Sequence, residues 1–417
     1  MTPDHAGSEF RRGWGTLLAS CAGLAFGVAT LAISYTIGVL MGPLQDEFGW
    51  SRAQILVSST IVSVVVGSLT LGVGWLADRT NVRRLVIGSQ LGFGLGFFAL
   101  GLFVTSLASL YILYFLLALV GVATTAVAFA KLITAQFVKH RGLALGLAMS
   151  GSGFCAFAVP PYLSYVVETF GWRAGYFAIG ALPLLVALPL TILFIGRQPD
   201  STRAKPTARP MQQVGTDSDF TLKQALVSYR FWATFMIFVL GSCVMTGLIT
   251  NYVPILQDEG YSATQAATMA GSFGVSVVVG RIVVGFLIDR WWAPLVGCLI
   301  FAPAAASIAL LAGGGLSTTA LVGTILMSGF AAGAEVDLMG FLVARYFGLR
   351  HFGKIYAGIY IGFALAPGFT TPLLGAARDH YGNYSAGLYV AAIALVGAAL
   401  LLVSLGRYPQ FPASKPS

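Results

Sequence analysis

Long, uninterrupted runs of apolar residues constrain the fold of this chain more than any other feature. One of them is GALPLLVALPLTILF, from Gly180 to Phe194. A helix needs about 20 predominantly apolar residues to cross a bilayer. Only 9% of the residues are charged, whereas soluble domains carry about 25%. A water-soluble fold of this size could not cover its surface with so few charges, so we expect the chain to lie in a membrane.

Apolar runs separated by charged or turn-rich gaps predict twelve transmembrane helices. They cover approximately residues 14–43, 53–77, 85–105, 107–137, 142–166, 173–195, 231–256, 264–288, 292–313, 317–344, 354–377 and 385–406. The expected fold class is an all-α membrane protein with twelve transmembrane helices in two pseudo-symmetric six-helix halves. The N-terminal half covers 1–196, a polar cytoplasmic linker covers 197–229, and the C-terminal half covers 230–417. Asp219 is expected to cap a short interfacial helix at the end of the linker.

Three segments of the first half recur in the second half, in the same order. The matching pairs are LQDEFGWSRAQ (44–54) with LQDEGYSATQ (256–265), GWLADR (74–79) with GFLIDR (285–290), and ETFGWRAGY (168–176) with DHYGNYSAGLY (379–389). Such repeats indicate a duplicated six-helix unit. Parallel halves related by an axis along the membrane normal occur in one large class of transporters.

The net charge is +9, but the basic residues lie in the gaps between spans and do not form a patch that would bind nucleic acid. Lys and Arg accumulate at the termini and in every second gap, whereas the alternate gaps hold only Arg52, Arg173 and Arg378. This positive-inside pattern predicts that both termini and the linker are cytoplasmic. We expect a multi-pass protein of the cell membrane (the inner membrane if the source is bacterial), surrounded by lipid and without a nucleic-acid partner.

No pattern for catalysis or nucleotide binding is visible in the sequence. The four cysteines lie inside apolar runs and lack metal-ligand spacing. No G-x-x-x-x-G-K-[ST] loop is present, which argues against ATP drive from this chain. We therefore expect no metal, no cofactor and no enzymatic activity.

A family resemblance appears in the loop between the second and third spans. GWLADRTNVRR (74–84) is similar to the cytoplasmic loop signature of the major facilitator superfamily, usually written G-x-L-a-D-R-x-G-R-R, with Asn81 where Gly is usual. GVLMGPLQDEFGWSRAQI and GAEVDLMGFLVARYFGLRHFGKIYAG further resemble the branch of monocarboxylate porters and oxalate/formate antiporters. The resemblance extends over essentially the whole chain and implies a transporter.

The resemblance also implies roles for individual residues. In that branch an arginine just ahead of the G-x-L-x-D loop in span 8 binds the substrate carboxylate, and Arg281 occupies this position. Oxalate antiporters carry a lysine in span 11 where this chain has Phe363, which makes oxalate a weaker expectation. We expect the signature loop and its copy to act as a gate, with plain topology-setting charge as the alternative. The gating residues are Asp78, Arg79, Arg83, Arg84, Asp289 and Arg290.

Four charged residues lie within predicted spans, where a charge is costly and indicates function. They are Lys131, Arg281, Glu335 and Asp337. At 1.5 Å per residue they lie about 12–15 Å from the cytoplasmic ends, near the middle of a core about 30 Å thick. A guanidinium binds a carboxylate through two parallel hydrogen bonds, and desolvation of a buried carboxylate suits a proton carrier. We predict Arg281 and Lys131 as substrate ligands and Glu335 or Asp337 as the coupling site. Mutual neutralisation of the four charges is the alternative.

Polar residues of spans 1, 7 and 11 complete the predicted substrate site. They are Tyr35, Asn251, Tyr356 and Tyr360, for which simple packing is the alternative. The expected function is transport of a small organic anion, a monocarboxylate above all, by a proton-linked symporter that works as a monomer through alternating access. Two alternatives remain open: efflux of an amphipathic, drug-like compound, and a non-transporting membrane receptor.

Overall fold

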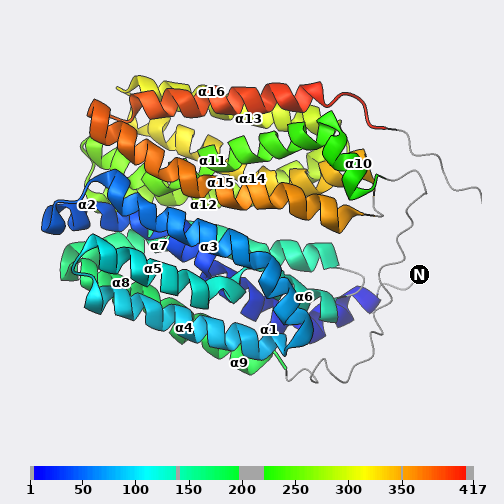
Figure 1. The fold of residues 1–417 in the computed structure, drawn as a ribbon, viewed down its shortest axis with the longest axis horizontal. Helices are drawn as coiled ribbons and strands as arrows, with labels where there is room; N and C mark the ends of the chain where they lie inside the picture. Colours follow the sequence, from blue (N-terminus) through cyan, green and yellow to red (C-terminus); the bar gives the residue numbers. More distant parts are fainter. Residues whose placement is uncertain (1–3, 138–140, 197–219, 349–350, 410–417) are drawn as a thin grey trace, which may run out of the picture.

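The structure is a computed structural model that describes residues 4–137, 141–196, 220–348 and 351–409 (Figure 1). Its described residues form helices and no strand, and twelve of the helices are long and apolar enough to span a membrane. The prediction of an all-α membrane protein with twelve spans is therefore confirmed. The spans are Phe10–Tyr35, Arg52–Thr70, Val82–Phe103, Leu107–Ile133, Ala144–Phe170, Trp172–Phe194, Tyr229–Asp258, Ala263–Ile288, Ala293–Gly313, Thr318–Phe347, Lys354–Tyr381 and Ser385–Ser404.

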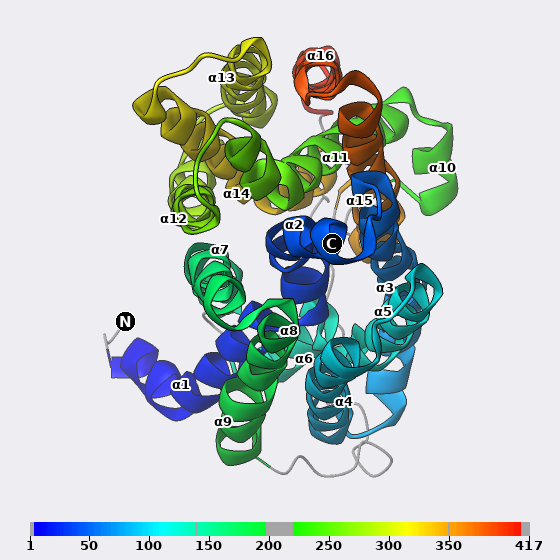
Figure 2. The same cartoon turned by 90° about the vertical axis from the view of Figure 1, so that its left-hand side faces the viewer.

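The helices form two bundles that lie side by side (Figures 1 and 2). The first contains α1 (Asp4–Ala25), η1 (Ala29–Tyr35), α2 (Ile37–Phe48), α3 (Arg52–Arg79), α4 (Val82–Phe103), α5 (Leu107–Gly121), η2 (Val122–Thr124), α6 (Ala126–Gln136), α7 (Arg141–Phe170), α8 (Trp172–Leu182), η3 (Pro183–Ala187) and α9 (Leu188–Phe194). The second contains α10 (Leu222–Val227), α11 (Tyr229–Asp258), α12 (Ala263–Ile288), α13 (Ala293–Gly313), α14 (Thr318–Phe347), α15 (Phe352–Tyr381) and α16 (Ser385–Ser404). We call the right-hand end of the molecule in Figure 1 the α10 end and the left-hand end the α2 end.

The linker is only partly visible. Residues 197–219, including the predicted cap Asp219, lie outside the described residues. The short helix expected after them is α10, and its N-cap is Thr221, which forms a capping box with Gln224. The boundaries of the halves and of the linker stay predictions.

Two spans expected to be continuous helices, the first and the fourth, are interrupted where they touch each other. Thr125 is extended (φ −81°, ψ 165°), so α6 starts anew after η2. The Thr124 hydroxyl accepts a hydrogen bond of 2.9 Å from the N–H of Val28. Val28 lies close to the interruption of the first span, so this bond satisfies a backbone N–H at that interruption. A Cβ atom at Gly27 would lie 2.6 Å from the carbonyl oxygen of Thr124. The contact therefore requires glycine at this position.

Small residues line the contact between the two bundles. Where α7 meets α12, a Cβ atom on Gly274 would lie only 2.3 Å from the carbonyl oxygen of Gly153. Where α3 meets α15, a Cβ atom on Gly368 would lie 2.7 Å from the Cβ atom of Ser63. Lipid is as apolar as a leucine side chain, so association of helices in a membrane depends on close packing of this kind. The two bundles thus approach each other at the backbone.

This packing predicts that Gly274→Ala lowers the Tm of the purified protein, by about 1–3 kcal/mol of stability, because the facing atom belongs to the backbone and cannot turn aside. Gly285→Ala is the matched control, since it lies on the same helix and a Cβ atom there meets nothing within 4 Å. The control should leave the Tm unchanged or raise it, because alanine favours a helix over glycine by about 1 kcal/mol. Equal effects of the two changes would contradict the close contact.

Candidate functional site

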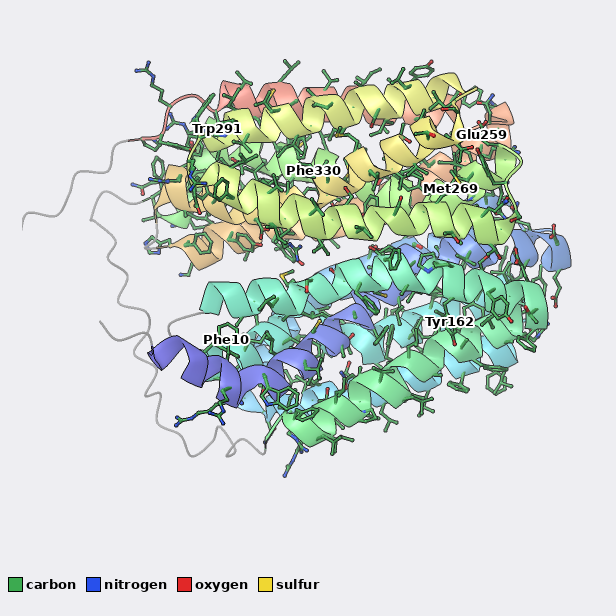
Figure 3. The ribbon with its side chains drawn as sticks, turned by 180° about the vertical axis from the view of Figure 1, so that it is seen from behind. Phe10, Tyr162, Glu259, Met269, Trp291 and Phe330 are labelled. Atoms are coloured by element: carbon green, nitrogen blue, oxygen red, sulfur yellow. The ribbon has the colours of Figure 1, made fainter. Side chains whose placement is uncertain are left out.

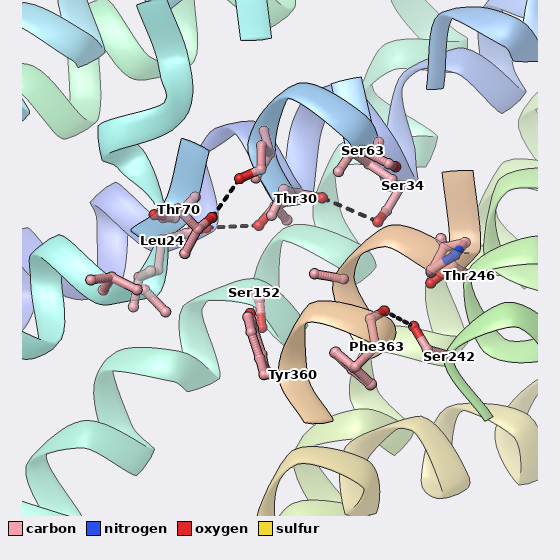
Figure 4. Close-up of a pocket in the computed structure, with 18 of the residues that line it drawn as sticks. Leu24, Thr30, Ser34, Ser63, Thr70, Ser152, Ser242, Thr246, Tyr360 and Phe363 are labelled. Atoms are coloured by element: carbon pink, nitrogen blue, oxygen red, sulfur yellow. Dashed lines mark hydrogen bonds between the residues drawn. The ribbon is translucent and has the colours of Figure 1, made fainter. Parts of the chain in front are cut away.

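A cavity of about 240 Å³ lies between the two bundles and is lined by both of them (Figure 4). Its walls come from α1 and η1, α3, the break between η2 and α6, and α7 on one side, and from α11 and α15 on the other. No charged side chain is among its described lining residues. Ten lining residues carry a hydroxyl group: Thr30, Ser34, Ser63, Thr70, Thr124, Thr125, Ser152, Ser242, Thr246 and Tyr360.

The four predicted polar contacts lie in different surroundings. Tyr360 lines the cavity, and Tyr356, one helical turn away, stacks on it with ring centroids 5.9 Å apart. Tyr35 and Asn251 are not among the residues that line the cavity. Asn251 is fully buried in α11, where its amide donates to the carbonyl oxygen of Gly247 at 2.9 Å. The substrate role of all four stays a prediction.

Arg281 on α12 pairs with Asp337 on α14, as the common depth of the two residues suggested. Its Nε atom lies 3.5 Å from Asp337 Oδ2, and the two side chains are 16% and 36% exposed. This Nε–H is buried and makes no hydrogen bond within the described part of the chain, so the pairing is loose. Asp337 interacts electrostatically with Tyr356, and the Tyr356 ring stacks on Tyr360, which lines the cavity.

Glu335 points away from this pair. Its side chain is 4% exposed, and Oε1 has no hydrogen-bond partner among the described residues. A Cβ atom on Gly241 of α11 would lie 2.5 Å from this oxygen, so the carboxyl group occupies the space that glycine leaves. The two acidic residues of α14 thus have different environments, one beside a cation and one packed against α11.

Lys131 lies half-buried on α6 and is not among the residues that line the cavity. Its role as a substrate ligand stays a prediction.

The predicted gate residues lie at the α10 end. Arg83 donates from Nε to the carbonyl oxygen of Ile195 at 2.6 Å and from a terminal nitrogen to that of Ile192 at 2.9 Å. These are the last carbonyl groups of α9, so Arg83 caps that helix. Arg290 packs over the ring of Phe286, with 3.5 Å between its guanidinium carbon and the ring centroid. The side chains of Arg79, Arg84 and Asp289 are exposed, and that of Asp78 lies outside the described residues.

An ionic network at the α2 end joins the two bundles and was not predicted from the sequence. Arg52 on α3 donates two hydrogen bonds to Asp258 on α11, at 3.1 and 2.9 Å. Arg378 on α15 donates a third to the same carboxylate at 2.6 Å. Arg52 also donates to the Tyr384 hydroxyl at 2.8 Å, and this hydroxyl donates to Asn251 at 3.4 Å. Asn251 thus belongs to the network that closes this end.

Two carboxylates reinforce the closure. Each accepts hydrogen bonds from the first turn of a helix that belongs to the other bundle. Asp379 on α15 accepts hydrogen bonds from the backbone N–H groups of Arg52 and Ala53 at 3.4 and 3.0 Å. Glu168 on α7 accepts from the N–H of Thr264 at 2.9 Å and from its hydroxyl. A helix N-terminus attracts negative charge because of its free N–H groups and its dipole. We call these two contacts the reciprocal caps.

The sequence repeats contain a signal for the reciprocal caps. The repeat that holds Ser51 and Gln54 in the first half has Ser262 and Gln265 in the second, and both pairs form capping boxes that start α3 and α12. The third repeat places Glu168 opposite Asp379 at its first position. The sequence therefore contains both partners of each cap: an acidic residue that recurs in the third repeat, and a helix start that recurs in the first repeat.

A neighbouring contact holds α2 against α8 inside the first bundle. Glu47 accepts hydrogen bonds from the indole N–H of Trp172 and from Arg173, the latter at 2.9 Å. These donors, Trp172 foremost, hold the pKa of Glu47 below its usual value. The contact stabilises the α2 end without crossing between the bundles.

Comparisons with known proteins agree with this architecture. The family model of the Major Facilitator Superfamily matches residues 16–339. Among curated proteins, monocarboxylate transporter 11 of Mus musculus is 27% identical over 98% of this chain and 90% of that protein. A gallate transporter of Pseudomonas putida is 26% identical over 81% of this chain and 83% of that protein.

Solved structures show the same fold. A bacterial homologue of the human lysosomal transporter Spinster, crystallised inward-facing and unoccupied, has a TM-score of 0.65 at 18% identity. The alignment covers 97% of this chain and 96% of that one. At this identity the likeness concerns the fold.

The network at the α2 end predicts that Asp258→Asn favours separation of the bundles there, because two arginines lose their shared carboxylate. The change should shift the balance of closed and open forms by about 1–2 kcal/mol, roughly 5–30-fold. Spin labels on the exposed positions Thr105 and Thr319 would report the distance between the bundles at this end.

Asp46→Asn is the matched control for this experiment. Asp46 is an exposed acidic residue near the same end, and its side chain takes part in no ion pair within the described residues. Its replacement should leave the distance distribution unchanged. An unchanged distribution in Asp258→Asn as well would refute a closing role for the network.

Proposed function

The chain belongs to the major facilitator superfamily, in its monocarboxylate branch, and is a membrane transporter; we propose that it carries a small organic monocarboxylate together with a proton, by alternating access. The observation that carries the proposal is the loose pair of Arg281 and Asp337, in a protein whose two bundles line a common cavity. The names of the relatives, monocarboxylate transporters and a gallate transporter, support a carboxylate substrate.

We propose that the α10 end faces the cytoplasm in a cell membrane. The basis is the excess of Lys and Arg in the gaps on the side of the termini and the linker. The α2 end, which holds the network around Asp258, then faces the outside of the cell. In the bacterial case the membrane is the inner one.

In the proposed cycle the substrate takes over a pairing that the empty protein makes internally. Arg281 cannot lose its proton, and a lone cation at this depth is costly. Asp337 pairs with it in the structure, but at 3.5 Å and without a hydrogen bond from Nε. A substrate carboxylate offers two oxygens in the geometry that a guanidinium binds best. Binding therefore displaces Asp337, which links loading of the carboxylate to a change at an acidic side chain.

Glu335 is the second acidic residue in the proposed coupling. An ionised carboxylate without a partner is strongly disfavoured inside a protein. Glu335 has no partner for Oε1 and is packed against Gly241 on α11. We assign it the role of holding the proton that travels with the substrate, while Asp337 responds to the substrate itself.

The proposed alternation uses charges at both ends of the molecule. At the α2 end the network around Asp258 and the reciprocal caps hold the bundles together in the structure. When they separate, the signature residues at the α10 end take over the closure. These are Asp78, Arg79, Arg83, Arg84, Asp289 and Arg290.

Efflux of an amphipathic compound is the second candidate function. The observation that favours it is the absence of charged side chains among the described residues that line the cavity. Transport of a neutral compound that does not change when Arg281 is replaced would favour this candidate.

The proposal predicts that Arg281→Gln abolishes stabilisation of the purified protein by organic anions and their uptake into proteoliposomes. Arg281→Lys keeps the charge but loses the two-pronged geometry, so it should weaken binding about tenfold or more while the protein still folds. Arg12→Gln, which removes an exposed arginine of α1, is the control and should bind as the parent does. Normal anion binding by Arg281→Gln would refute the carboxylate anchor.

The coupling proposal predicts different outcomes for the two acidic residues of α14. Glu335→Gln should abolish accumulation driven by a pH gradient but keep exchange of bound substrate, since exchange needs no net movement of protons. Asp337→Asn should destabilise the empty protein by leaving Arg281 unpaired, and substrate should therefore raise the Tm more than in the parent. Uptake, counterflow exchange and Tm measured on the same preparations test both statements. Unchanged pH-driven accumulation in both variants would remove α14 from the coupling mechanism.

A further inference from the structure

The hydroxyl groups that line the cavity are mostly committed as donors. Thr30 donates to the carbonyl oxygen of Leu24 at 2.8 Å, and Ser242 donates to that of Phe363 at 2.7 Å. Five more lining hydroxyls donate to backbone carbonyls in the same way: those of Ser34, Thr70, Thr124, Thr125 and Ser152. A hydroxyl has one proton and two lone pairs. Seven of the ten lining hydroxyls therefore offer the cavity acceptors and no proton.

The other three hydroxyls differ in this respect. Those of Ser63, Thr246 and Tyr360 make no hydrogen bond within the described part of the chain. They are free to donate to an acceptor on a ligand, and the Tyr360 ring stacks on Tyr356, which interacts electrostatically with Asp337. The cavity thus has a few donors and a much larger number of acceptors.

One wall of the cavity is aromatic. Four rings on α15 follow one another at helical spacing: Phe352, Tyr356, Tyr360 and Phe363. Consecutive centroids lie 5.5, 5.9 and 5.6 Å apart, with interplanar angles of 23°, 17° and 31°. The last two rings line the cavity, on the side away from Thr30 and Ser34 (Figure 4). We call these four residues the aromatic ladder. It offers stacking surfaces from the α10 end of the helix to the cavity.

We propose that the carried monocarboxylate is an aromatic acid whose single ring bears hydroxyl groups. This inference rests on the proposed function for the carboxylate itself. A hydroxylated ring brings the donors that the acceptor-rich wall lacks, and its face stacks on Tyr360 and Phe363. The cavity of about 240 Å³ is smaller than most ligand sites, which hold about 300–1,000 Å³, so one ring suits it better than two. An aliphatic acid would leave the aromatic wall without a matching face.

The position of the charge fits this substrate. A benzoate-type carboxylate lies at the edge of the ring, in its plane, and its hydroxyl groups lie at the far edge. Asp337, the partner of Arg281, interacts electrostatically with Tyr356, and the Tyr356 ring stacks on Tyr360. We therefore place the carboxylate toward Tyr356 and the hydroxyl groups among the serine and threonine side chains.

The test measures binding of a small panel of acids to the purified full chain by calorimetry. The panel is 4-hydroxybenzoate, 4-methoxybenzoate, benzoate, cyclohexanecarboxylate and lactate. The hydroxy and methoxy compounds both carry an oxygen on the ring, but only the first can donate a hydrogen bond. We expect 4-hydroxybenzoate to bind roughly fivefold or more tighter than 4-methoxybenzoate, and benzoate tighter than cyclohexanecarboxylate.

Two variants locate these preferences in the cavity. Phe363→Leu should remove the preference of benzoate over cyclohexanecarboxylate. The combined change Thr30→Val, Ser34→Ala and Ser152→Ala removes three of the seven acceptor hydroxyls and should lower the ratio of hydroxy to methoxy affinities. If the combined variant does not fold, the ratio in the parent protein decides alone.

The outcomes separate this inference from the proposed function. Equal or tighter binding of lactate or cyclohexanecarboxylate than of the hydroxylated ring would overturn the inference and leave a monocarboxylate transporter. A methoxy compound that binds as well as the hydroxy compound would also overturn it. Failure of every acid in the panel to bind, with phenol binding instead, would refute the carboxylate and with it the proposed function.

Discussion

The arrangement of the two bundles depends on the reciprocal caps. Asp379 and Glu168 each satisfy free N–H groups at a helix start that belongs to the opposite bundle. A helix terminus that loses such a partner must find water or another acceptor. The caps can form only because glycines such as Gly274 let the backbones approach at the neighbouring contact. Short-range packing and capping thus reinforce each other, and both are lost together when the bundles separate at this end.

This coupling explains how one end of a transporter can close firmly and still open. The caps and the network of Arg52, Asp258 and Arg378 lie at the surface, where ion pairs contribute only about 0–1 kcal/mol each because water competes with them. Several such contacts together hold the closed form, yet none is so strong that it prevents opening. A ligand shifts the equilibrium between the closed and open forms only by the difference between its affinities for the two forms. The cavity between the bundles is the place where such a difference can arise.

The sequence predicts most of the fold, because the membrane leaves few choices. A backbone in lipid must satisfy its own hydrogen bonds, so long apolar runs become helices, and the repeats place six spans in each half. The breaks in the first and fourth spans could not be predicted in this way. They depend on a contact between Gly27 and Thr124, residues far apart in the chain, and neither residue interrupts an apolar run. Local composition carries no information about such a contact.

The site was predicted in part, and the reason is geometric. Depth can be counted along a helix, so Arg281 and Asp337 were expected at one level, and the structure pairs them. The direction of a side chain depends on how its helix is rotated in the bundle, which counting does not reveal. Glu335 is only two residues away from Asp337 but fills the space beside Gly241. The hydroxyl-lined cavity was missed because serine and threonine in an apolar helix carry no signal until their positions around the helix are known.

The pairing of charges in the empty protein has a physical advantage for transport. Arg281 keeps Asp337 as a partner when the cavity is empty, so the unloaded protein does not bear a lone charge at this depth. Seven of the ten hydroxyl groups that line the cavity likewise donate to backbone carbonyls, through contacts such as that of Thr30 with Leu24. The empty site therefore satisfies its charges and most of its hydrogen-bond donors, which is the condition a carrier must meet to return without its substrate.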